Sequence, residues 1–368
     1  MKILYCITSS SWGGAQLHVY ELCKYERQRG NEIVFIVGNQ GLLLEKIRSL
    51  PGIKVIVVPN LKRSISPLND IKATIELRRI FIREHPDIIH LHSSKAGTLG
   101  RIAARGLNAK VVFTVHGWSF TEGISSKFNK RIFRFIERYV ARFTDLFICV
   151  SEYDRKLGFK YHVLNKKIPT KVIHNGAPTI ASEKINYSIH TPLKFIMIAR
   201  FSPQKDQEIL IKAVSRLPRN SFFLTFVGDG ETLSRCQSLV KELGLTKQVN
   251  FVGFKKDISS YLVENDVYIL TTHYEGLPIS VIEAMSYGLP VIVSDVGGDN
   301  ELVISGKNGF LIHNQKELER SLDHFIHNPE LIKKMGEASL SLFFRQFTLQ
   351  KQLQNTHDIY QELLNKAY

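Results

Sequence analysis

The sequence Glu275-Gly-Leu-Pro-Ile-Ser-Val-Ile-Glu283 follows an apolar, β-branched run, Val267-Tyr-Ile-Leu-Thr-Thr-His273. That run predicts a buried strand. Gly276 and Pro278 interrupt it, and proline suits the first turn of a helix, where its missing N–H costs no hydrogen bond. The stretch therefore predicts a strand, a loop and a helix, which is the repeating unit of an α/β fold with a parallel sheet.

The loop between this strand and this helix has the properties of a site for a nucleotide sugar. The start of a helix offers free backbone N–H groups to a diphosphate, in the crevice where open α/β sheets bind ligands. Glu275 can accept hydrogen bonds from sugar hydroxyls, and Glu283 from a vicinal diol such as ribose. Paired glutamates also occur by chance, so the motif alone is weak evidence. It makes Gly276, Leu277, Pro278 and Glu283 candidate donor-binding residues and Glu275 a candidate catalytic residue.

A second strand end carries two cations. Leu193-Lys-Phe-Ile-Met-Ile-Ala-Arg200 predicts a strand, and Arg200 and Lys205 flank the loop that follows it. Cations beside a departing diphosphate stabilise its charge as that charge develops. For either residue alone, an ion pair with a core carboxylate or a solvated side chain is the simpler interpretation. Together with Glu275, the two cations indicate a catalytic role.

The chain of 368 residues is longer than one core comfortably supports, which predicts two domains. Strand and helix patterns alternate in both halves and predict an α/β protein with two parallel, Rossmann-like sheets. Between the halves, from about 176 to 192, the sequence is polar and aperiodic, as expected of a linker. We expect strands near 2–8, 32–38, 54–58, 88–91, 110–115, 146–150 and 171–173, then near 194–199, 222–227, 249–252, 267–272, 290–294 and 309–312.

Further motifs follow in a fixed order along the chain. They are Gly13-Gly14, His92-Ser-Ser-Lys-Ala-Gly97, His116-Gly117-Trp118, Val150-Ser-Glu152, His174-Asn-Gly176, Val227-Gly-Asp-Gly230 and Gly297-Gly298 with Glu301. With the residues above, this series resembles family-4 retaining glycosyltransferases of the GT-B architecture over nearly the whole chain. The segments at His92 and His116 look most like enzymes that build lipid-linked saccharides for capsule, exopolysaccharide or O-antigen. Asp299-Asn300 departs from the apolar residue and proline frequent in the family, which leaves the path of that loop open.

The resemblance implies two Rossmann-like domains that face a cleft. It implies an acceptor-binding domain over 1–176, a linker over 177–192, a nucleotide-sugar-binding domain over 193–345, and a segment over 346–368 whose helix packs back on the first domain. It also implies that His116 contacts and orients the donor sugar. Gly13, Gly14 and Gly228 would let the backbone approach the donor closely. His92, Ser94 and Lys95 would bind the phosphates of a polyprenyl-linked acceptor, although a serine cap with a solvated lysine is the alternative for Ser94 and Lys95.

The implied reaction is the retaining transfer of a hexosyl or N-acetylhexosaminyl group from a nucleoside diphosphate-sugar, expected to be UDP-linked, to a saccharide acceptor on a polyprenyl diphosphate. The resemblance also implies that no metal or other cofactor is required, and the sequence agrees in having no Asp-x-Asp clamp and no His/Cys cluster at ligand spacing. We expect front-face transfer, in which the leaving phosphate oxygen helps to accept the incoming proton, over a double displacement. A soluble enzyme with a small acceptor and a sugar-nucleotide epimerase are the alternatives.

The net charge of +15 is concentrated in the first half: residues 1–180 contain 29 Lys/Arg and 13 Asp/Glu, whereas residues 181–368 contain 20 and 21. This asymmetry suggests an anionic membrane surface as a partner, or else nucleic acid, for which no recognition motif is present. Segment 127–143 is basic and has apolar residues at helical spacing, which predicts an interfacial helix or, alternatively, a core helix with a basic outer face. The predicted membrane contacts are Lys130, Arg131, Arg134 and Arg138, with Phe128, Ile132, Phe135, Ile136 and Tyr139 between them.

The remaining sequence features predict a cytoplasmic protein at the inner face of the plasma membrane. No apolar run reaches the roughly 18 to 20 residues needed to span a bilayer. The first residues predict a strand and not a signal peptide, and the four cysteines lie far apart. The expected partners are the nucleotide sugar, a lipid-linked saccharide and an anionic membrane surface, with no nucleic acid.

Overall fold

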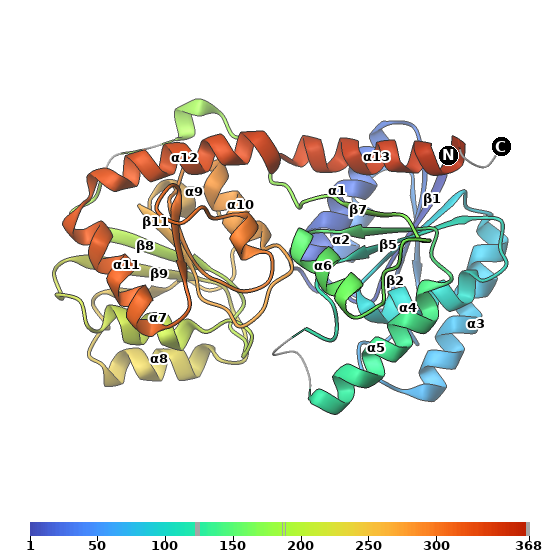
Figure 1. Ribbon diagram of the computed structural model, residues 1–368, viewed down its shortest axis with the longest axis horizontal. Coiled ribbons are helices and arrows are strands. Elements are labelled where there is room, and N and C mark those ends of the chain that lie inside the picture. Colours follow the sequence, from blue (N-terminus) through green and yellow to red (C-terminus); the bar gives the residue numbers. More distant parts are fainter. Residues whose placement is uncertain (122–125, 186, 188, 366–368) are drawn as a thin grey trace. The chain divides into compact units, whose positions relative to one another are not determined.

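A computed structural model describes residues 1–121, 126–185, 187 and 189–365. These residues form two compact units (Figure 1). The first unit comprises the described residues up to His174 together with 351–365, and the second comprises those within Asn175–Gln350. The strand pattern of the sequence thus yields two separate sheets, one in each unit.

The first unit contains a seven-stranded parallel sheet in the order β3-β2-β1-β4-β5-β6-β7. Its strands are β1 (Lys2–Ile7), β2 (Glu32–Val37), β3 (Ile53–Val57), β4 (Ile88–His92), β5 (Lys110–Val115), β6 (Leu146–Cys149) and β7 (Thr170–Val172). Its helices are α1 (Gly14–Gln28), α2 (Leu42–Arg48), α3 (Pro67–Glu84), α4 (Ser94–Ala104), α5 (Lys127–Ala141), α6 (Glu152–Lys160) and most of α13 (Leu349–Asn365).

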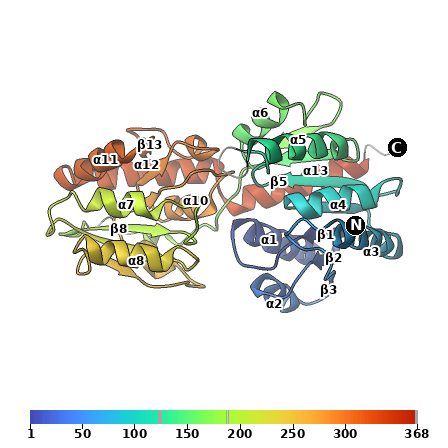
Figure 2. The ribbon, with the colours of Figure 1, turned by 90° about the horizontal axis from the view of Figure 1, so that it is seen from below.

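Helices cover both faces of this sheet, which explains why its strands are continuous apolar runs. Successive strand residues point to opposite faces. Leu4 belongs to a core that includes Leu77 of α3 and Leu99 of α4, whereas its neighbour Tyr5 contacts Tyr360 of α13. Helix α4 packs between α3 and α5, and Figure 2 shows the three helices in one layer.

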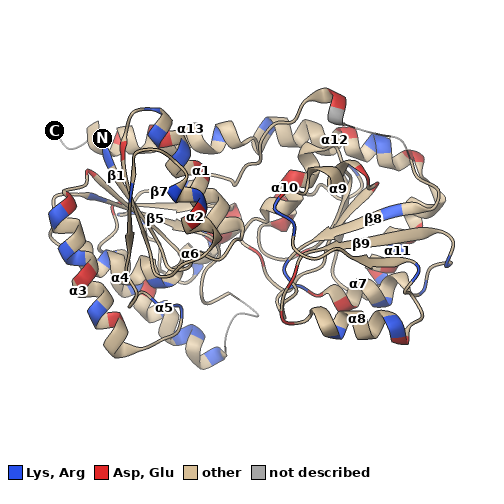
Figure 3. Ribbon diagram, turned by 180° about the vertical axis from the view of Figure 1, so that it is seen from behind, with Lys and Arg blue, Asp and Glu red and all other residues tan. Residues whose placement is uncertain are grey.

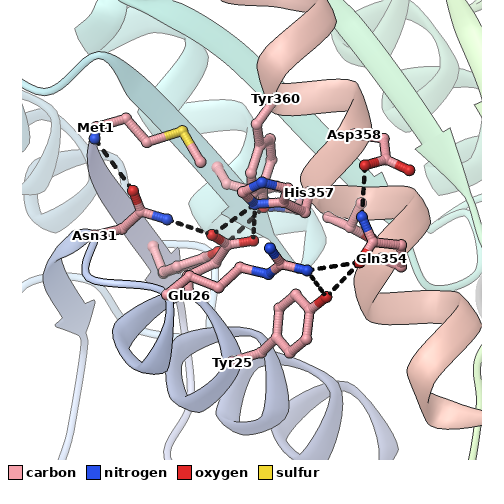
Figure 4. Close-up of polar contacts among 12 residues, drawn as sticks. Met1, Tyr25, Glu26, Asn31, Gln354, His357, Asp358 and Tyr360 are labelled. Atoms are coloured by element: carbon pink, nitrogen blue, oxygen red, sulfur yellow. Dashed lines mark hydrogen bonds and ion pairs between the residues drawn. The ribbon is translucent and has the colours of Figure 1, made fainter.

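Helix α13 confirms the prediction that the C-terminal segment packs on the first domain. The hydroxyl of Tyr360 lies within hydrogen-bonding distance of Tyr5 and of His90. His357 Nδ1 lies 3.1 Å from both carboxylate oxygens of Glu26 on α1 (Figure 4). Asn31 Nδ2 donates to the same carboxylate at 2.6 Å. These contacts fix α13 to the layer formed by α1 and the sheet.

The second unit contains a six-stranded parallel sheet in the order β10-β9-β8-β11-β12-β13. Its strands are β8 (Leu193–Ile198), β9 (Phe222–Val227), β10 (Val249–Phe251), β11 (Val267–Leu270), β12 (Val291–Ser294) and β13 (Gly309–Ile312). Its α-helices are α7 (Gln207–Val214), α8 (Leu233–Glu242), α9 (Ser259–Val263), α10 (Ile279–Ser286), α11 (Gln315–His327) and α12 (Glu330–Gln346), and it has short 3₁₀ turns at Ser182–Lys184 and Asp299–Glu301.

Every expected strand is present, with its ends shifted by at most two residues. The helix after Glu275 is also present, but its start differs slightly from the expectation. Pro278 occupies the N-cap with an extended backbone (φ −72°, ψ 118°), and Ile279 is the first helical residue. Proline therefore precedes the first turn and does not form part of it, a shift of the size common at helix ends.

Candidate active site

The loops after β8 and β11 form the centre of the candidate active site. The two strands are neighbours in a parallel sheet, so their carboxyl ends lie at one edge. Lys205 Nζ donates to Glu275 Oε1, and the Thr272 hydroxyl donates to the same oxygen at 3.0 Å. The side chains of Lys205 and Glu275 are only 15% and 10% exposed. The predicted catalytic cation and the predicted sugar-binding carboxylate are therefore held together and largely shielded from water.

Further hydrogen bonds join these two loops. Gln204 Nε2 donates to the carbonyl of Tyr274 at 2.7 Å, and the backbone N–H of His273 donates to the carbonyl of Gln204 at 2.9 Å. Gln207 Nε2 donates to the Arg200 carbonyl at 3.0 Å. The side chain of Arg200 is exposed at this loop. The loop that carries both predicted cations is thus fixed to the loop that carries Glu275.

A third loop, after β12, packs on Glu275 from the other side. Gly297 has φ 61°, and a Cβ atom there would lie 1.9 Å from the Glu275 carbonyl oxygen, so only glycine fits. The N–H of Gly298 donates to the carbonyl of Gly276 at 3.1 Å. The Asp299-Asn300 sequence did not predict the path of this loop, and the hydrogen bond from Gly298 to Gly276 defines it.

Asp299 is a buried acid that the sequence analysis did not identify as part of the site. Its side chain is fully buried, and neither carboxyl oxygen has a hydrogen-bond partner among the described residues. Burial and then the nearby charge of Glu275 raise the pKa of Asp299 well above its usual range, while Lys205 opposes this effect. The neutral, protonated form of Asp299 is therefore favoured beside the Lys205–Glu275 pair. The departure of Asp299-Asn300 from the residues expected on the resemblance was the available signal.

The remaining predicted donor-binding residues of the second unit surround the same loops. Gly228 follows β9 with φ 148°, and a Cβ atom there would lie 2.0 Å from the Ala199 carbonyl oxygen, beside Arg200. Leu277 is buried, and its carbonyl accepts a hydrogen bond from Asn175 Nδ2 at 2.7 Å. These contacts hold Gly276, Leu277 and Pro278 at the start of α10.

Glu283 lies one turn into α10, and burial raises the pKa of its carboxyl group to about 7. A carboxylate accepts hydrogen bonds from a diol, whereas the protonated acid is a weaker acceptor. The predicted ribose ligand is therefore a group whose charge changes near neutral pH.

In the first unit the structure brings together three histidines from distant parts of the sequence. His18 lies in α1, His92 ends β4, and His116 follows β5. His92 Nδ1 lies 3.1 Å from His116 Nε2, and the ring of His18 meets the ring of His116 edge-on with centroids 4.8 Å apart. Gln352 of α13 contacts His18 Nδ1 at 3.1 Å. Gly13 and Gly14 stand at the start of α1, as N-cap and first helical residue.

These histidines are the group among the described residues that could hold a metal ion, because one nitrogen from each lies within 4.8 Å of the others. No two of these histidines lie at a recognisable ligand spacing in the sequence, so no local pattern predicts the group. Burial lowers the pKa of His92 and of His116 well below the usual value, so both rings are neutral at physiological pH. Nε2 of His92 is buried and has no hydrogen-bond partner within the part of the chain that the structure describes.

The other predicted acceptor-binding residues have different surroundings. Ser94 is the first residue of α4, and the helix start is capped by Thr8, whose hydroxyl accepts the N–H of Ala96 at 3.0 Å. Lys95 pairs with Asp70 of α3 at 2.7 Å, and its side chain is 14% exposed. Lys95 is therefore neither solvated nor a free cation, and binding of an acceptor phosphate would require the Lys95–Asp70 pair to open.

Helix α5 has an apolar face on the outside. Phe128 and Phe135 are 71% and 70% exposed, and Ile132 and Tyr139 are also exposed, whereas Glu137 is buried against the unit. Helix α5 thus packs on the core through Phe133 and Ala141, while its outward side carries apolar side chains as well as basic ones. Two of the four predicted membrane contacts are engaged by Tyr161: Arg134 lies over its ring, and Arg138 donates a hydrogen bond to its carbonyl. The other two, Lys130 and Arg131, have no ion-pair or hydrogen-bond partner for their side chains among the described residues. Among the described residues, no helix is long and apolar enough to cross a membrane.

Comparison with known proteins assigns the class. The family model for Glycosyltransferase Family 4 matches residues 12–179, and the model for Glycosyl transferases group 1 matches residues 180–341. A UDP-Gal:alpha-D-GlcNAc-diphosphoundecaprenol alpha-1,3-galactosyltransferase from Escherichia coli is 32% identical over 336 residues, which cover 85% of each chain. The chain therefore belongs to glycosyltransferase family 4.

Two further similarities refine this assignment. The O-antigen biosynthesis glycosyltransferase WbnH from Escherichia coli is 29% identical and is matched over 85% of this chain and 86% of its own. The crystal structure of Anabaena Alr3699/HepE in complex with UDP-glucose matches with a TM-score of 0.83 and 23% identity, over 98% of this chain and 100% of that one. The fold is therefore GT-B, with two Rossmann-like domains, as predicted.

Proposed function

We propose that this glycosyltransferase moves a hexosyl or N-acetylhexosaminyl group, with retention, from a UDP-sugar to a saccharide on a polyprenyl diphosphate during synthesis of a bacterial surface polysaccharide. The observation that carries the proposal is the Lys205–Glu275 pair beside the start of α10. The relative from Escherichia coli, whose name specifies UDP-Gal and a diphosphoundecaprenol acceptor, supports the donor and acceptor classes. Family membership favours this function over an epimerase or a nucleic-acid-binding protein.

In the proposed donor site the charge of the leaving diphosphate is stabilised by the second unit. Lys205 and Arg200 supply positive charge, and the start of α10 supplies backbone N–H groups. Glu275 accepts hydrogen bonds from the sugar hydroxyls and Glu283 from the ribose diol. Because Lys205 is already paired with Glu275, the diphosphate gains an ammonium group whose position is set before the donor arrives.

The first unit is proposed to orient the sugar and to bind the acceptor. His116 is neutral and can donate one hydrogen bond to a sugar hydroxyl, and its partner His92 sets its orientation. Gly13 and Gly14 leave the start of α1 open to a diphosphate or a sugar. The side chain of His92 is fully buried, which suits a residue that positions His116. The predicted acceptor site at His92, Ser94 and Lys95 remains part of the proposal.

We propose front-face transfer without a required metal ion. In this step the leaving phosphate oxygen accepts the proton of the incoming hydroxyl while the new glycosidic bond forms on the face that the diphosphate leaves. Glu275 is engaged by Lys205 and Thr272, which suits a ligand of the sugar better than a nucleophile. A double displacement would instead require a free carboxylate on the opposite face.

We also propose that the protein works at the inner face of the plasma membrane. Phe128, Ile132, Phe135 and Tyr139 form an outward apolar stripe on α5, with Lys130 and Arg131 beside it. A helix with this pattern lies at the level of anionic headgroups. Such a location would bring the enzyme to an acceptor anchored in the bilayer.

The test is to incubate the protein with UDP-glucose, UDP-galactose, UDP-GlcNAc or UDP-GalNAc and a polyprenyl-diphosphate-linked GlcNAc, and to determine the anomeric configuration of the product by NMR. We expect transfer from one of these donors with an α linkage, which retains the configuration of the donor. A β-linked product would overturn retention. Efficient transfer to a small soluble saccharide, with none to the lipid-linked one, would favour the small-acceptor alternative.

A further inference from the structure

Helix α3 has two apolar faces, and only one of them is buried. Ala73, Leu77, Ile80 and Phe81 pack in the core of the first unit. On the opposite side of the helix, a second set of aliphatic residues recurs at intervals of three, four and seven positions, so its members share one face. This outer set consists of Leu68 (75% exposed), Ile71 (58%), Ile75 (48%) and Ile82 (47%), and Ile65 (72%) precedes it in the chain.

The outer face of α3 belongs to the same helical layer as the outer face of α5. Helix α4 packs against both α3 and α5, so the outward sides of the three helices all point away from the sheet (Figure 2). Among the described residues, ten of the fifteen exposed large hydrophobic side chains lie between positions 65 and 139, on or next to these helices. This concentration identifies the layer as one extended surface.

The charges around the outer apolar residues of α3, here called the α3 stripe, favour an anionic surface as the partner of this face. Lys62, Arg63, Lys72 and Arg79 are exposed around the stripe, and Figure 3 shows the Lys and Arg residues along α3. Of the three acids within α3, Asp70 pairs with Lys95, Glu84 is buried against Lys2 and Lys54, and Glu76 is half-buried, so the cations outnumber the acids on the outer side of the helix. A second copy of the chain on this face would bring like charges together. Anionic headgroups complement the cations, and acyl chains complement the aliphatic side chains.

We propose that the outer face of α3 is a second lipid-binding surface, so that the first unit lies on an anionic bilayer through both α3 and α5. This inference rests on the proposed membrane location and adds to it a helix that neither the charge pattern of segment 127–143 nor the family assignment identified. Leu68, Ile71 and Ile75 enter the interface, while Lys62, Arg63 and Lys72 remain at the headgroups.

Two variants with equal numbers of substitutions test the proposal. Leu68→Ser, Ile71→Ser and Ile75→Ser are combined in one protein, and the exposed residues Phe223, Ile304 and Phe344 of the second unit are replaced by serine in the other. Sedimentation with vesicles of phosphatidylglycerol and phosphatidylcholine measures binding. We expect the α3 variant to bind at least roughly tenfold more weakly than wild type, and the control variant to bind like wild type.

Each other outcome has a definite meaning. Equal binding by wild type and the α3 variant would overturn the role of α3 and leave the role of α5 intact. A wild-type protein that binds no vesicle would overturn the membrane location itself. A change of oligomeric state in the α3 variant, without a change in lipid binding, would identify the face as a contact between copies and contradict the proposal.

A spectroscopic measurement separates insertion from charge attraction alone. An environment-sensitive fluorophore is attached at Ile71→Cys, where labelling is selective because all four native cysteines are buried. We expect its emission to shift to the blue when anionic vesicles are added. An unchanged spectrum under conditions where the protein sediments with the vesicles would contradict insertion of α3.

Discussion

Lys205 and Glu275 are 70 positions apart in the sequence, yet the ammonium group of one donates a hydrogen bond to the carboxylate of the other. The cause is the sheet order, which places β8 next to β11 and brings the loops after both strands to one edge. Both side chains are mostly shielded from water, so each of the two charges depends on the other for its stabilisation.

Replacement of either residue by alanine should reduce transfer by about 10²-fold or more, because a stabilising charge at the leaving group or a ligand of the sugar is lost. Steady-state rates at saturating donor measure the effect. Lys212→Ala is the matched control, since Lys212 lies on α7, is half exposed and pairs with Glu208. Wild-type turnover in Lys205→Ala and Glu275→Ala would place the active site elsewhere.

Glu283 should make donor affinity dependent on pH. Its carboxyl group has a pKa of about 7, so its ionised form, which accepts hydrogen bonds from the ribose diol, increases as the pH rises through neutrality. We expect the Kd for UDP, measured by calorimetry, to decrease from about pH 6 to about pH 8 in wild type. Glu283→Gln should bind UDP more weakly and lose this dependence. The same pH profile in both proteins would assign Glu283 a structural role.

Asp299 should make the stability of the fold decrease as the pH rises. Its pKa in the folded protein is raised above that of an unfolded chain, so the folded state holds a proton that the unfolded state releases. The resulting stabilisation is complete at a pH below the pKa of Asp299 in the unfolded chain. It is lost as the pH rises toward the pKa of Asp299 in the folded protein. Asp299→Asn cannot ionise, so its Tm relative to wild type should rise from about pH 5 to about pH 8. Asp295→Asn is the control, because Asp295 is 26% exposed; equal trends in both variants would contradict burial as the cause.

The four cations predicted on α5 should not contribute equally to membrane binding. Arg134 and Arg138 contact Tyr161, whereas Lys130 and Arg131 do not. Lys130→Gln with Arg131→Gln should therefore weaken sedimentation with anionic vesicles more than Arg134→Gln with Arg138→Gln, since each basic residue near the surface is worth about 1 kcal/mol. Equal losses would show that the arginine contacts open at the membrane. No loss in either pair would remove α5 as an anchor.

Much of the fold and the donor loops could be predicted from local sequence. Strands that are buried on both faces form continuous apolar runs, so every strand could be recognised in the sequence. In a parallel sheet the carboxyl ends of these strands lie at one edge. The pairing of Lys205 with Glu275 follows from that order once the two strands are neighbours. Chemistry carried by residues next to strand ends is therefore the part of a site that a sequence discloses most readily.

Other parts of the site depend on packing that no local pattern encodes. His18 on α1 meets His92 and His116, which lie at the ends of β4 and β5, only through the packing of the folded unit. The pairing of Lys95 with Asp70 depends on how α3 packs on α4. Helix α5 carries apolar residues on two sides, Phe133 facing the core and Phe135 facing outward, and the sequence does not distinguish the buried side from the exposed one.

The central proposal is a metal-independent transfer of sugar from a UDP-sugar to a polyprenyl-diphosphate-linked saccharide at the Lys205–Glu275 site. The most direct measurement follows radiolabelled sugar from a UDP-sugar into the solvent-extractable lipid fraction, in the presence of EDTA, with vesicles that contain the lipid-linked acceptor. We predict incorporation by wild type that EDTA leaves unchanged and that Glu275→Ala reduces by about 10²-fold or more. Absence of incorporation from every UDP-sugar tested, or equal incorporation by Glu275→Ala, would contradict the proposal.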